Sequence, residues 1–386
     1  MNKKSLIWSM VLTLALSSIV WLGADMSLAK TSADFTDLKD LDEATKAKFD
    51  AMIVAGVFNG KSEDNFGLND NMNRAQFAKV AALIFGLEVD SDLRTSSFTD
   101  VKADDPSNGY ALPYIEAVKK AGITEGVGGG AFDPAGQVTK EQLAAFLIRG
   151  LGQDADARQA SGVDDPTVSD WAKGYVEVAL HQNLLSNGSD GTFSGRNAVN
   201  RELLVLGAFE SAKTFEDAQP LEVSGAEFAA ENKLNLTLTA GVDIDSIDLT
   251  QITVNGVPLN PALDSFVLSE DKKTIIITLR KGFQLDRFKT PVIDVNGLKT
   301  LFGNDVENED GSPIPVKVTE YPVSPPEATP NPSPSPDPTP SPSPSQDPNP
   351  NPNPNPNPNP NPNPNPNPNP NPDHHNALFK VLSFKP

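Results

Sequence analysis

Two short segments, Asn187-Gly188-Ser189-Asp190-Gly191-Thr192-Phe193 and Asn200-Arg201-Glu202-Leu203, decide the fold of the first half of this chain. The first is a turn rich in Gly and Asp that ends on an aromatic residue, and the second begins with an Asn that can cap a helix. The pattern is repeated without a gap, at offsets of 66 and 61 residues: residues 56–77 align with residues 122–143, which align with residues 183–204. This periodicity predicts three copies of one structural unit.

Each copy is predicted to form a helix, a loop and a second helix. In the first helix, apolar residues recur at helical spacing, as in Phe49, Met52 and Ile53. The second helix begins after a capping residue, and a Gln three residues later completes a capping box in the first two copies but not in the third. One helix pair is too small to bury a core, so we expect the three copies to share one. The capping residues are Asn73, Thr139 and Asn200, and the loop aromatics, expected to plug the core of their own repeat, are Phe66, Phe132 and Phe193.

From Pro220 to Val318 the apolar period changes from helical to alternating. Leu234, Leu236 and Leu238 alternate with polar residues, as strands with one buried face do. Asn255-Gly256 lies between two short apolar runs and is a strong hairpin signal. Several short strands over about 100 residues predict a two-sheet, immunoglobulin-like sandwich.

The two ends of the chain carry biased segments. Lys3 and Lys4 precede an apolar run, and Ser27-Leu28-Ala29 offers the small residues of a cleavage site, so residues 1–29 are predicted to be a secretory signal peptide. A membrane anchor is the alternative reading of the same run. Near the other end, Pro alternates with Asn, Ser, Asp or Thr, which predicts a disordered spacer because such a tract cannot bury enough apolar surface.

The predicted organisation is therefore multidomain: an α-helical repeat region, an all-β Ig-like sandwich and a disordered Pro-rich tail. Its segments are the signal peptide (1–29), repeats 1 to 3 (30–93, 94–158 and 159–215), the sandwich (216–320), the Pro/Asn-rich linker (321–372) and a short C-terminal tail (373–386).

Composition excludes several classes of function. The formal net charge of −20 disfavours binding to nucleic acid, because phosphates are repelled by an acidic chain. The chain contains no Cys, which rules out disulfides, thiolate metal sites and a Cys nucleophile. No cofactor is predicted, and no Ser/His/Asp set can be assembled around the three His residues. Acidic clusters at residues 243–248 and 305–310 could bind calcium, but ordinary acidic turns are the simpler interpretation.

The three repeats resemble S-layer homology domains. The features that carry the resemblance are an aromatic-x-Asp opening, a Trp-Ala pair on the first helix, an Asp-Gly-Thr-Phe loop and a Thr-Arg-Ala-Glu start of the second helix. One example of each feature in this chain is, in the same order, Phe35-Thr36-Asp37, Trp171-Ala172, Asp190-Gly191-Thr192-Phe193 and Asn73-Arg74-Ala75-Gln76. The chain departs from the pattern at Ala44 and Tyr110, which replace the Trp, and at Lys140, which replaces the Arg.

This resemblance implies a three-pronged pseudo-trimer that binds secondary cell-wall polysaccharide, often pyruvylated, in grooves between repeats. It also implies an extracellular location in the cell wall or S-layer of a Gram-positive bacterium, with possible self-assembly in a surface layer. No membrane partner is expected after cleavage of the leader. The strand-rich region is similar to the Ig-like modules that accompany such repeats.

A pyruvate ketal is a carboxylate on a sugar, so its site needs a cation and a flat apolar surface. Arg74, Lys140 and Arg201 each fall at the first position of a helix, where the macrodipole disfavours a cation and free N–H groups can attract an anion. They are the candidate ligand-binding cations, unless they pair with Glu141, Glu202 or Asp70. Trp171 and Tyr110 are candidates for stacking on sugar rings, with simple core packing as the alternative.

We expect this chain not to be an enzyme but a wall-anchored surface protein. Two alternatives stay open. In one, the Ig-like domain is an adhesin that binds an external ligand. In the other, the chain is a wall-anchored glycan hydrolase, which would need a cleft with paired carboxylates that the small strand-rich module has little room to supply.

Overall fold

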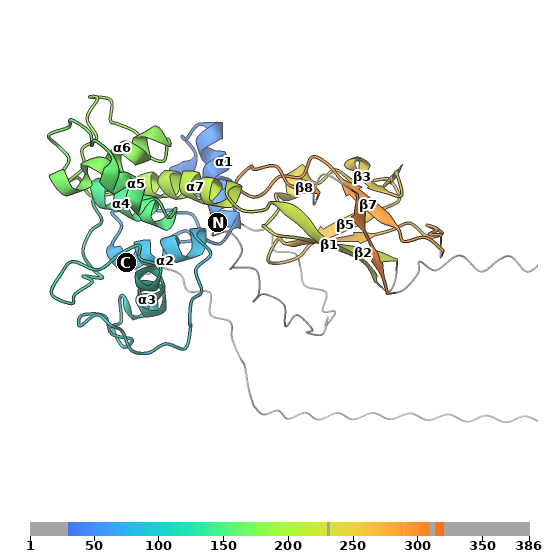
Figure 1. The fold of residues 1–386 in the computed structure, drawn as a ribbon, viewed down its shortest axis with the longest axis horizontal. Helices are drawn as coiled ribbons and strands as arrows, with labels where there is room; N and C mark the ends of the chain where they lie inside the picture. Colours follow the sequence, from blue (N-terminus) through green and yellow to red (C-terminus); the bar gives the residue numbers. More distant parts are fainter. Residues whose placement is uncertain (1–29, 230–231, 287, 309–312, 320–386) are drawn as a thin grey trace, which may run out of the picture.

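The structure is a computed structural model, and it describes residues 30–229, 232–286, 288–308 and 313–319. The predicted signal peptide, the Pro-rich linker and the C-terminal tail lie outside the described residues. The described chain forms a helical unit followed by a β domain (Figure 1).

The helical unit contains three helix pairs, as the repeats predict. Each predicted capping side chain accepts a hydrogen bond from the third N–H of its helix, and the capping box is complete after Asn73 and Thr139 but not after Asn200. A short additional helix, α5 (Asp154–Gln159), precedes the third pair. The pairs are α1 (Glu43–Val54) with α2 (Arg74–Ile84), α3 (Leu112–Lys120) with α4 (Lys140–Gly150), and α6 (Lys173–His181) with α7 (Arg201–Asp217).

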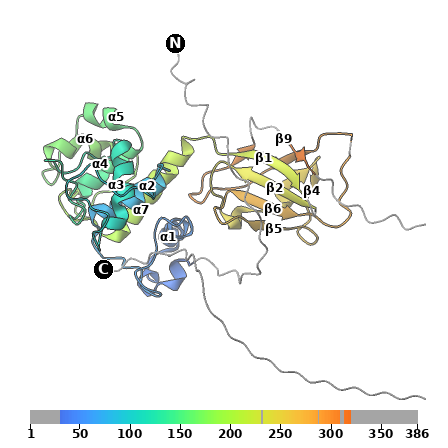
Figure 2. The same cartoon turned by 90° about the horizontal axis from the view of Figure 1, so that it is seen from below.

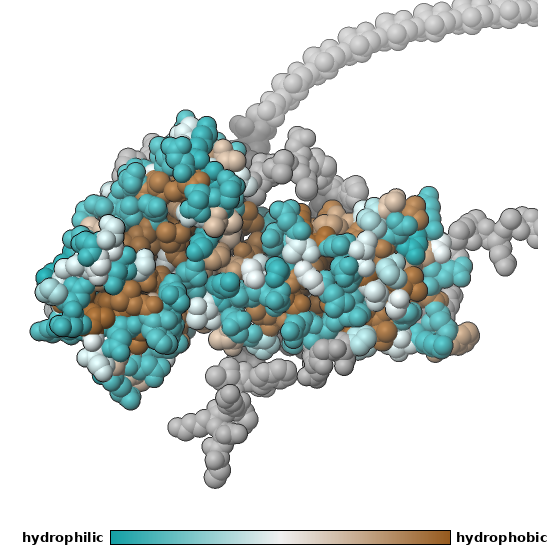
Figure 3. All heavy atoms as spheres, turned by 90° about the horizontal axis from the view of Figure 1, so that it is seen from above, coloured by the Kyte–Doolittle hydropathy of each residue, from teal (hydrophilic) through white to brown (hydrophobic). Residues whose placement is uncertain are grey.

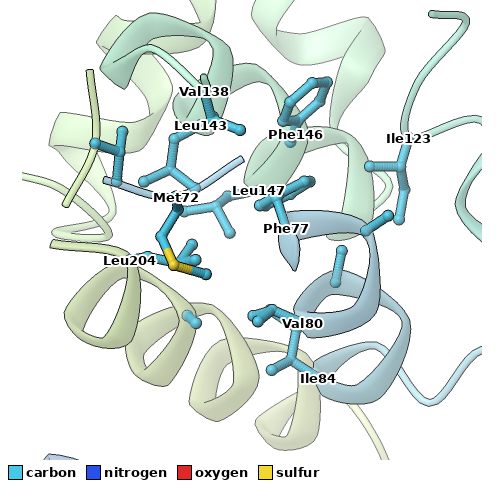
Figure 4. Packing of buried hydrophobic residues seen from close by; sticks show 14 of the residues in the cluster. Met72, Phe77, Val80, Ile84, Ile123, Val138, Leu143, Phe146, Leu147 and Leu204 are labelled. Carbon is cyan, nitrogen blue, oxygen red and sulfur yellow. The ribbon is translucent and has the colours of Figure 1, made fainter. Parts of the chain in front are cut away.

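The three pairs close into a ring. The second helix of each repeat packs on the first helix of the next: α2 on α3, α4 on α6, and α7 on α1. The second helices α2, α4 and α7 also contact one another at the centre, where Figure 4 shows Phe77, Phe146 and Leu204 converging. Because every helix pair buries its apolar stripe against a neighbouring repeat, the three copies share one hydrophobic core.

Three backbone hydrogen bonds tie the repeats together at the centre of the ring. They join one residue from each repeat in a closed triangle: Met72 N–H donates to Val199 O (3.0 Å), Val199 N–H to Val138 O (2.8 Å), and Val138 N–H to Met72 O (3.1 Å). Each donor and acceptor comes from a different repeat, so no two repeats can satisfy this triangle without the third.

The β domain consists of two sheets. One has the order β10-β1-β2-β6-β5, with β8 also paired to β1, and the other has the order β4-β3-β7-β9. Buried residues of both sheets, such as Leu236 and Ile293, form one core, which confirms the predicted two-sheet architecture. The strands are β1 (Glu222–Ala229), β2 (Lys233–Leu238), β3 (Ile252–Val254), β4 (Val257–Pro258), β5 (Ser265–Leu268), β6 (Thr274–Thr278), β7 (Val292–Val295), β8 (Glu307–Asn308), β9 (Ile314–Pro315) and β10 (Lys317–Val318).

The predicted hairpin at Asn255-Gly256 is present between β3 and β4. Both turn residues have positive φ, 51° and 76°, as a two-residue type I′ turn requires. Thr253 pairs with Pro258 and Val254 with Val257 across the hairpin.

The two units meet along α7 and the loop that follows β7 (Figure 2). Phe302 packs edge-on against Phe209, with ring centroids 6.0 Å apart, and the Asn304 side chain donates to Lys213 O (3.0 Å) and to the Glu216 carboxylate (3.2 Å). Burial raises the pKa of Glu216 above its usual value. Figure 3 shows that both units also carry apolar residues on the surface in view.

Candidate functional site

Each second helix begins with a cation that lies over an aromatic ring of the next repeat. The rings are the loop phenylalanines, which sequence reasoning assigned only to the core of their own repeat. We name the three contacts by the repeats they join. They are the 1–2 junction (Arg74 Cζ, 4.7 Å from the centroid of Phe132), the 2–3 junction (Lys140 Nζ, 4.4 Å from Phe193) and the 3–1 junction (Arg201 Cζ, 4.4 Å from Phe66).

A carbonyl oxygen of the next repeat fixes each cation over its ring. Arg74 Nε donates to Phe132 O at 2.7 Å, Lys140 Nζ to Ser186 O at 2.6 Å, and Arg201 Nη2 to Asn59 O at 2.7 Å. A hydrogen bond from a charged donor is stronger than a neutral one, and a cation over a desolvated ring adds further attraction. The three cations therefore hold neighbouring repeats together.

The aspartate that opens each repeat positions the ring. The carboxylates of Asp37, Asp100 and Asp165 accept the N–H of the loop phenylalanine of their own repeat at 2.8, 2.8 and 2.6 Å. The Phe193 N–H and the Thr167 hydroxyl hold the pKa of Asp165 below its usual value. The aspartate and the phenylalanine recur in each repeat of the sequence, but the cation that completes each set comes from another repeat.

Arg74 and Arg201 are buried, although each was a candidate to contact the glycan. Each is only 3% exposed, because its guanidinium lies between the ring and the backbone of the next repeat. Lys140 is half-buried. Among the described residues, none of the three forms an ion pair, so the alternative pairing with Glu141, Glu202 or Asp70 is not what holds them.

The expectation of free N–H groups at these helix starts is also wrong. The first N–H of each helix, on Arg74, Lys140 and Arg201, donates to a loop carbonyl of the next repeat at 2.9 Å, and the second does so at 2.8–3.1 Å. The capping side chain takes the third. Backbone donors here are therefore used for assembly and leave no ready anion site of the kind that free helix N-termini provide.

The two predicted stacking residues lie at the same junctions as the cations. Trp171 belongs to the short helix η4 (Asp170–Ala172) of repeat 3, which contacts α4 at the 2–3 junction. Glu141 of α4 accepts from Ser169 N–H and Oγ at 2.9 and 2.8 Å, two residues before Trp171. The indole is 51% exposed, so it is not a core residue.

Tyr110 occupies the equivalent place at the 1–2 junction. It belongs to η3 (Gly109–Ala111), which contacts α2, and it is half-buried. Burial raises the pKa of its hydroxyl to about 12. At the 3–1 junction the corresponding residue is Ala44, so this junction has the cation and the ring but lacks the second aromatic residue.

Burial disfavours the charged form of each junction cation. It lowers the pKa of Arg74, of Lys140 and of Arg201, the last to about 10, against the opposing effect of nearby carboxylates. A pKa of about 10 leaves Arg201 protonated at neutral pH. Nη2 of Arg74 and Nε of Arg201 have no hydrogen-bond partner among the described residues, so two junctions keep unused donor capacity.

The remaining candidates do not form a site in the described residues. The carboxylates of Asp243 and Asp248 cap N–H groups two residues on, and Asp305 pairs with Lys299 at 2.6 Å. No group of three or more potential metal ligands occurs in the described ranges. No helix in the same ranges is long and apolar enough to cross a membrane.

The family model for the S-layer homology domain matches residues 35–78, 97–144 and 164–202. These three segments are S-layer homology repeats. Each matched segment runs from the opening aspartate element, through the loop phenylalanine, into the helix that the junction cation begins. The predicted three-repeat region is thereby confirmed.

Similar proteins include cell-surface proteins of several bacteria. The chain is 28% identical over 216 residues to the surface-layer 125 kDa protein of Lysinibacillus sphaericus, covering 55% of this chain and 17% of the relative. It is 34% identical over 153 residues to a cell surface protein of Thermoanaerobacter kivui, covering 39% and 18%. It is 30% identical over 144 residues to an uncharacterized cell wall amidase of Bacillus anthracis, covering 37% and 25%. The chain thus spans a quarter or less of these relatives' lengths.

Proposed function

We propose that this chain is a non-enzymatic surface protein that attaches to the bacterial cell wall through its three S-layer homology repeats. The partner is secondary cell-wall polysaccharide, and a pyruvylated glycan fits the chemistry of the junctions. The observation that carries the proposal is the 2–3 junction, where the half-buried Lys140 begins α4 and the half-exposed Trp171 belongs to η4, the element of the next repeat that contacts α4.

The roles of the five candidate residues differ in this proposal. Lys140 and Trp171 contact the glycan directly, since Lys140 keeps part of its surface and the Trp171 ring offers a flat apolar face. Tyr110 plays the stacking role at the 1–2 junction. Arg74 and Arg201 lie beneath the surface and contribute positive charge near an anionic sugar without contacting it.

The three junctions then differ as binding sites. The 2–3 junction has the most exposed aromatic residue, the 1–2 junction has a half-buried Tyr110, and the 3–1 junction has Ala44 in its place. We rank binding strength in that order. The β domain, which we interpret as Ig-like, acts as a spacer in this proposal.

The test is co-sedimentation of the chain from residue 30 onward with purified wall sacculi, before and after the wall polymer is stripped. Lys140→Ala should weaken binding to intact sacculi by roughly tenfold to a hundredfold, because a charge-assisted contact is lost. Trp171→Ala should weaken it as well. Val127→Ala is the matched control, since Val127 is an exposed apolar residue of repeat 2 outside the junctions.

Thermal melts of each variant separate loss of binding from loss of folding. Wild-type binding that survives stripping of the polymer would contradict the proposed partner. Folded Lys140→Ala and Trp171→Ala proteins that both bind like Val127→Ala would show that the 2–3 junction is not the site.

A further inference from the structure

In the part of the β domain that the structure describes, one sheet edge lacks the Pro and charged residues that normally prevent edge pairing. Three of the edge strands are protected: β4 and β9 end on Pro258 and Pro315, and β10 carries Lys317, which pairs with Glu227 at 3.2 Å. Among the described strands, β5 pairs only with β6 at the margin of its sheet, and it has neither Pro nor a charged residue along Ser265–Leu268.

The backbone of β5 offers hydrogen-bonding groups on its open side. Ser269 N–H donates to Thr274 O at 2.9 Å, and the register pairs Val267 with Ile276, so Val267 and Ser265 exchange hydrogen bonds with β6. The N–H and C=O groups of Phe266 and Leu268 therefore point away from β6. Figure 2 shows β5 at the outer margin of the sheet, next to β6.

The exposed side chains of this edge are apolar. Val267 is 54% exposed, and Leu263, just before the strand, is also exposed. Phe266 and Leu268 point to the other face and pack against the domain core. An uncharged apolar edge is unusual on a chain whose formal net charge is −20, and it is a place where two acidic copies can meet without like charges facing each other.

We propose that β5 is a self-association edge, and that its occupant is β5 of a second copy of this chain, paired antiparallel about a two-fold axis through Val267. In that register, Phe266 of each copy exchanges hydrogen bonds with Leu268 of the other, which satisfies the groups left open. Val267 faces its own equivalent on the exposed side. The contact is self-complementary and closes as a dimer, so it does not propagate into a fibre.

This inference does not depend on glycan binding and can be tested in solution. The chain contains no Cys, so a disulfide between two copies of a single-Cys variant can form only at the introduced residue. In the proposed register the two Val267 residues form a non-hydrogen-bonded pair with Cα atoms about 4.5 Å apart, within the range that a disulfide spans. Val267→Cys should therefore form a covalent dimer under mild oxidation.

The matched control is Val257→Cys, because Val257 is 51% exposed on the Pro-protected edge strand β4. We expect the Val267→Cys protein to dimerise roughly tenfold faster than the control, as proximity and orientation require. In sedimentation velocity, the wild-type chain from residue 30 onward should show a dimer that grows with concentration. Val267→Lys should remove that dimer and keep the fold, because a lysine at an exposed edge blocks pairing without disturbing the core.

Equal rates of disulfide formation at positions 267 and 257 would overturn the proposal, as would a wild-type chain that stays monomeric at every concentration. A dimer that persists in a folded Val267→Lys protein would also overturn it, since the contact would then lie elsewhere.

Discussion

Replacement of Arg201 by Ala should destabilise the whole helical unit. The change removes a charge-assisted hydrogen bond to Asn59 O, worth about 1.5–3 kcal/mol. It also removes a buried cation–ring contact with Phe66, worth up to about 2 kcal/mol. Against this, the desolvation of a cation whose Nε already lacks a partner is relieved. We expect a net loss of about 2–4 kcal/mol in the free energy of unfolding.

The chain provides its own optical probe for this measurement. Of its three Trp residues, Trp8 and Trp21 precede residue 30, so a chain that begins at residue 30 contains Trp171 alone. Urea unfolding followed by Trp fluorescence then reports the repeats and not the β domain, which has no Trp. Trp171 belongs to the 2–3 junction, whereas Arg201 belongs to the 3–1 junction. If Arg201→Ala shifts the unfolding transition seen by Trp171 fluorescence, the three repeats therefore unfold as one unit.

Arg196→Ala is the matched control, because Arg196 is exposed and its Nε lies 3.4 Å from Ser169 Oγ. It should change stability by less than about 0.5 kcal/mol. Arg201→Lys should recover part of the loss, since Lys keeps the charge but not the planar donor fork. If Arg201→Ala unfolded at the same urea concentration as Arg196→Ala, the structural role assigned to the junction cations would be refuted.

Two further predictions concern cooperativity and pH. Deletion of residues 160–215 should leave repeats 1 and 2 unfolded by circular dichroism, because it removes one corner of the Met72–Val138–Val199 triangle; a cooperative melt of the remaining helices would contradict the shared core. Burial raises the pKa of Glu216, so its contribution to the joint between the units is present at low pH and is lost as the pH rises through that raised value. Glu216→Gln can still accept from Asn304 without a charge. We expect this variant to exceed wild type in the free energy of unfolding by about 0.5–1 kcal/mol at neutral pH, and to equal wild type at acidic pH. Equal melting of the two proteins at both pH values would show that the buried carboxylate does not weaken the joint.

Local features of the sequence determined the elements of this protein. Helix starts follow from Asn73, Thr139 and Asn200, because a capping side chain and the apolar stripe behind it act within one helix. The β3–β4 hairpin follows from Asn255-Gly256, because only a few residues adopt positive φ at low cost. The repeat offsets likewise fixed three copies of one unit, since each copy carries the same local signals.

Tertiary structure alone decided what the junction residues do. A cation at the first position of a helix reads as exposed and poorly placed, and nothing local to Arg74 or Arg201 indicates that each is buried over a ring 58 or 135 residues away in the chain. The contact between cation and phenylalanine forms only when the three helix pairs close on one another. The same is true of the hydrogen bonds from the helix-start N–H groups to the next repeat. The partner segments have no fixed separation in the sequence. Sequence periodicity indicates which side chains of each repeat are buried. The residues against which those side chains pack are determined only when the three repeats assemble.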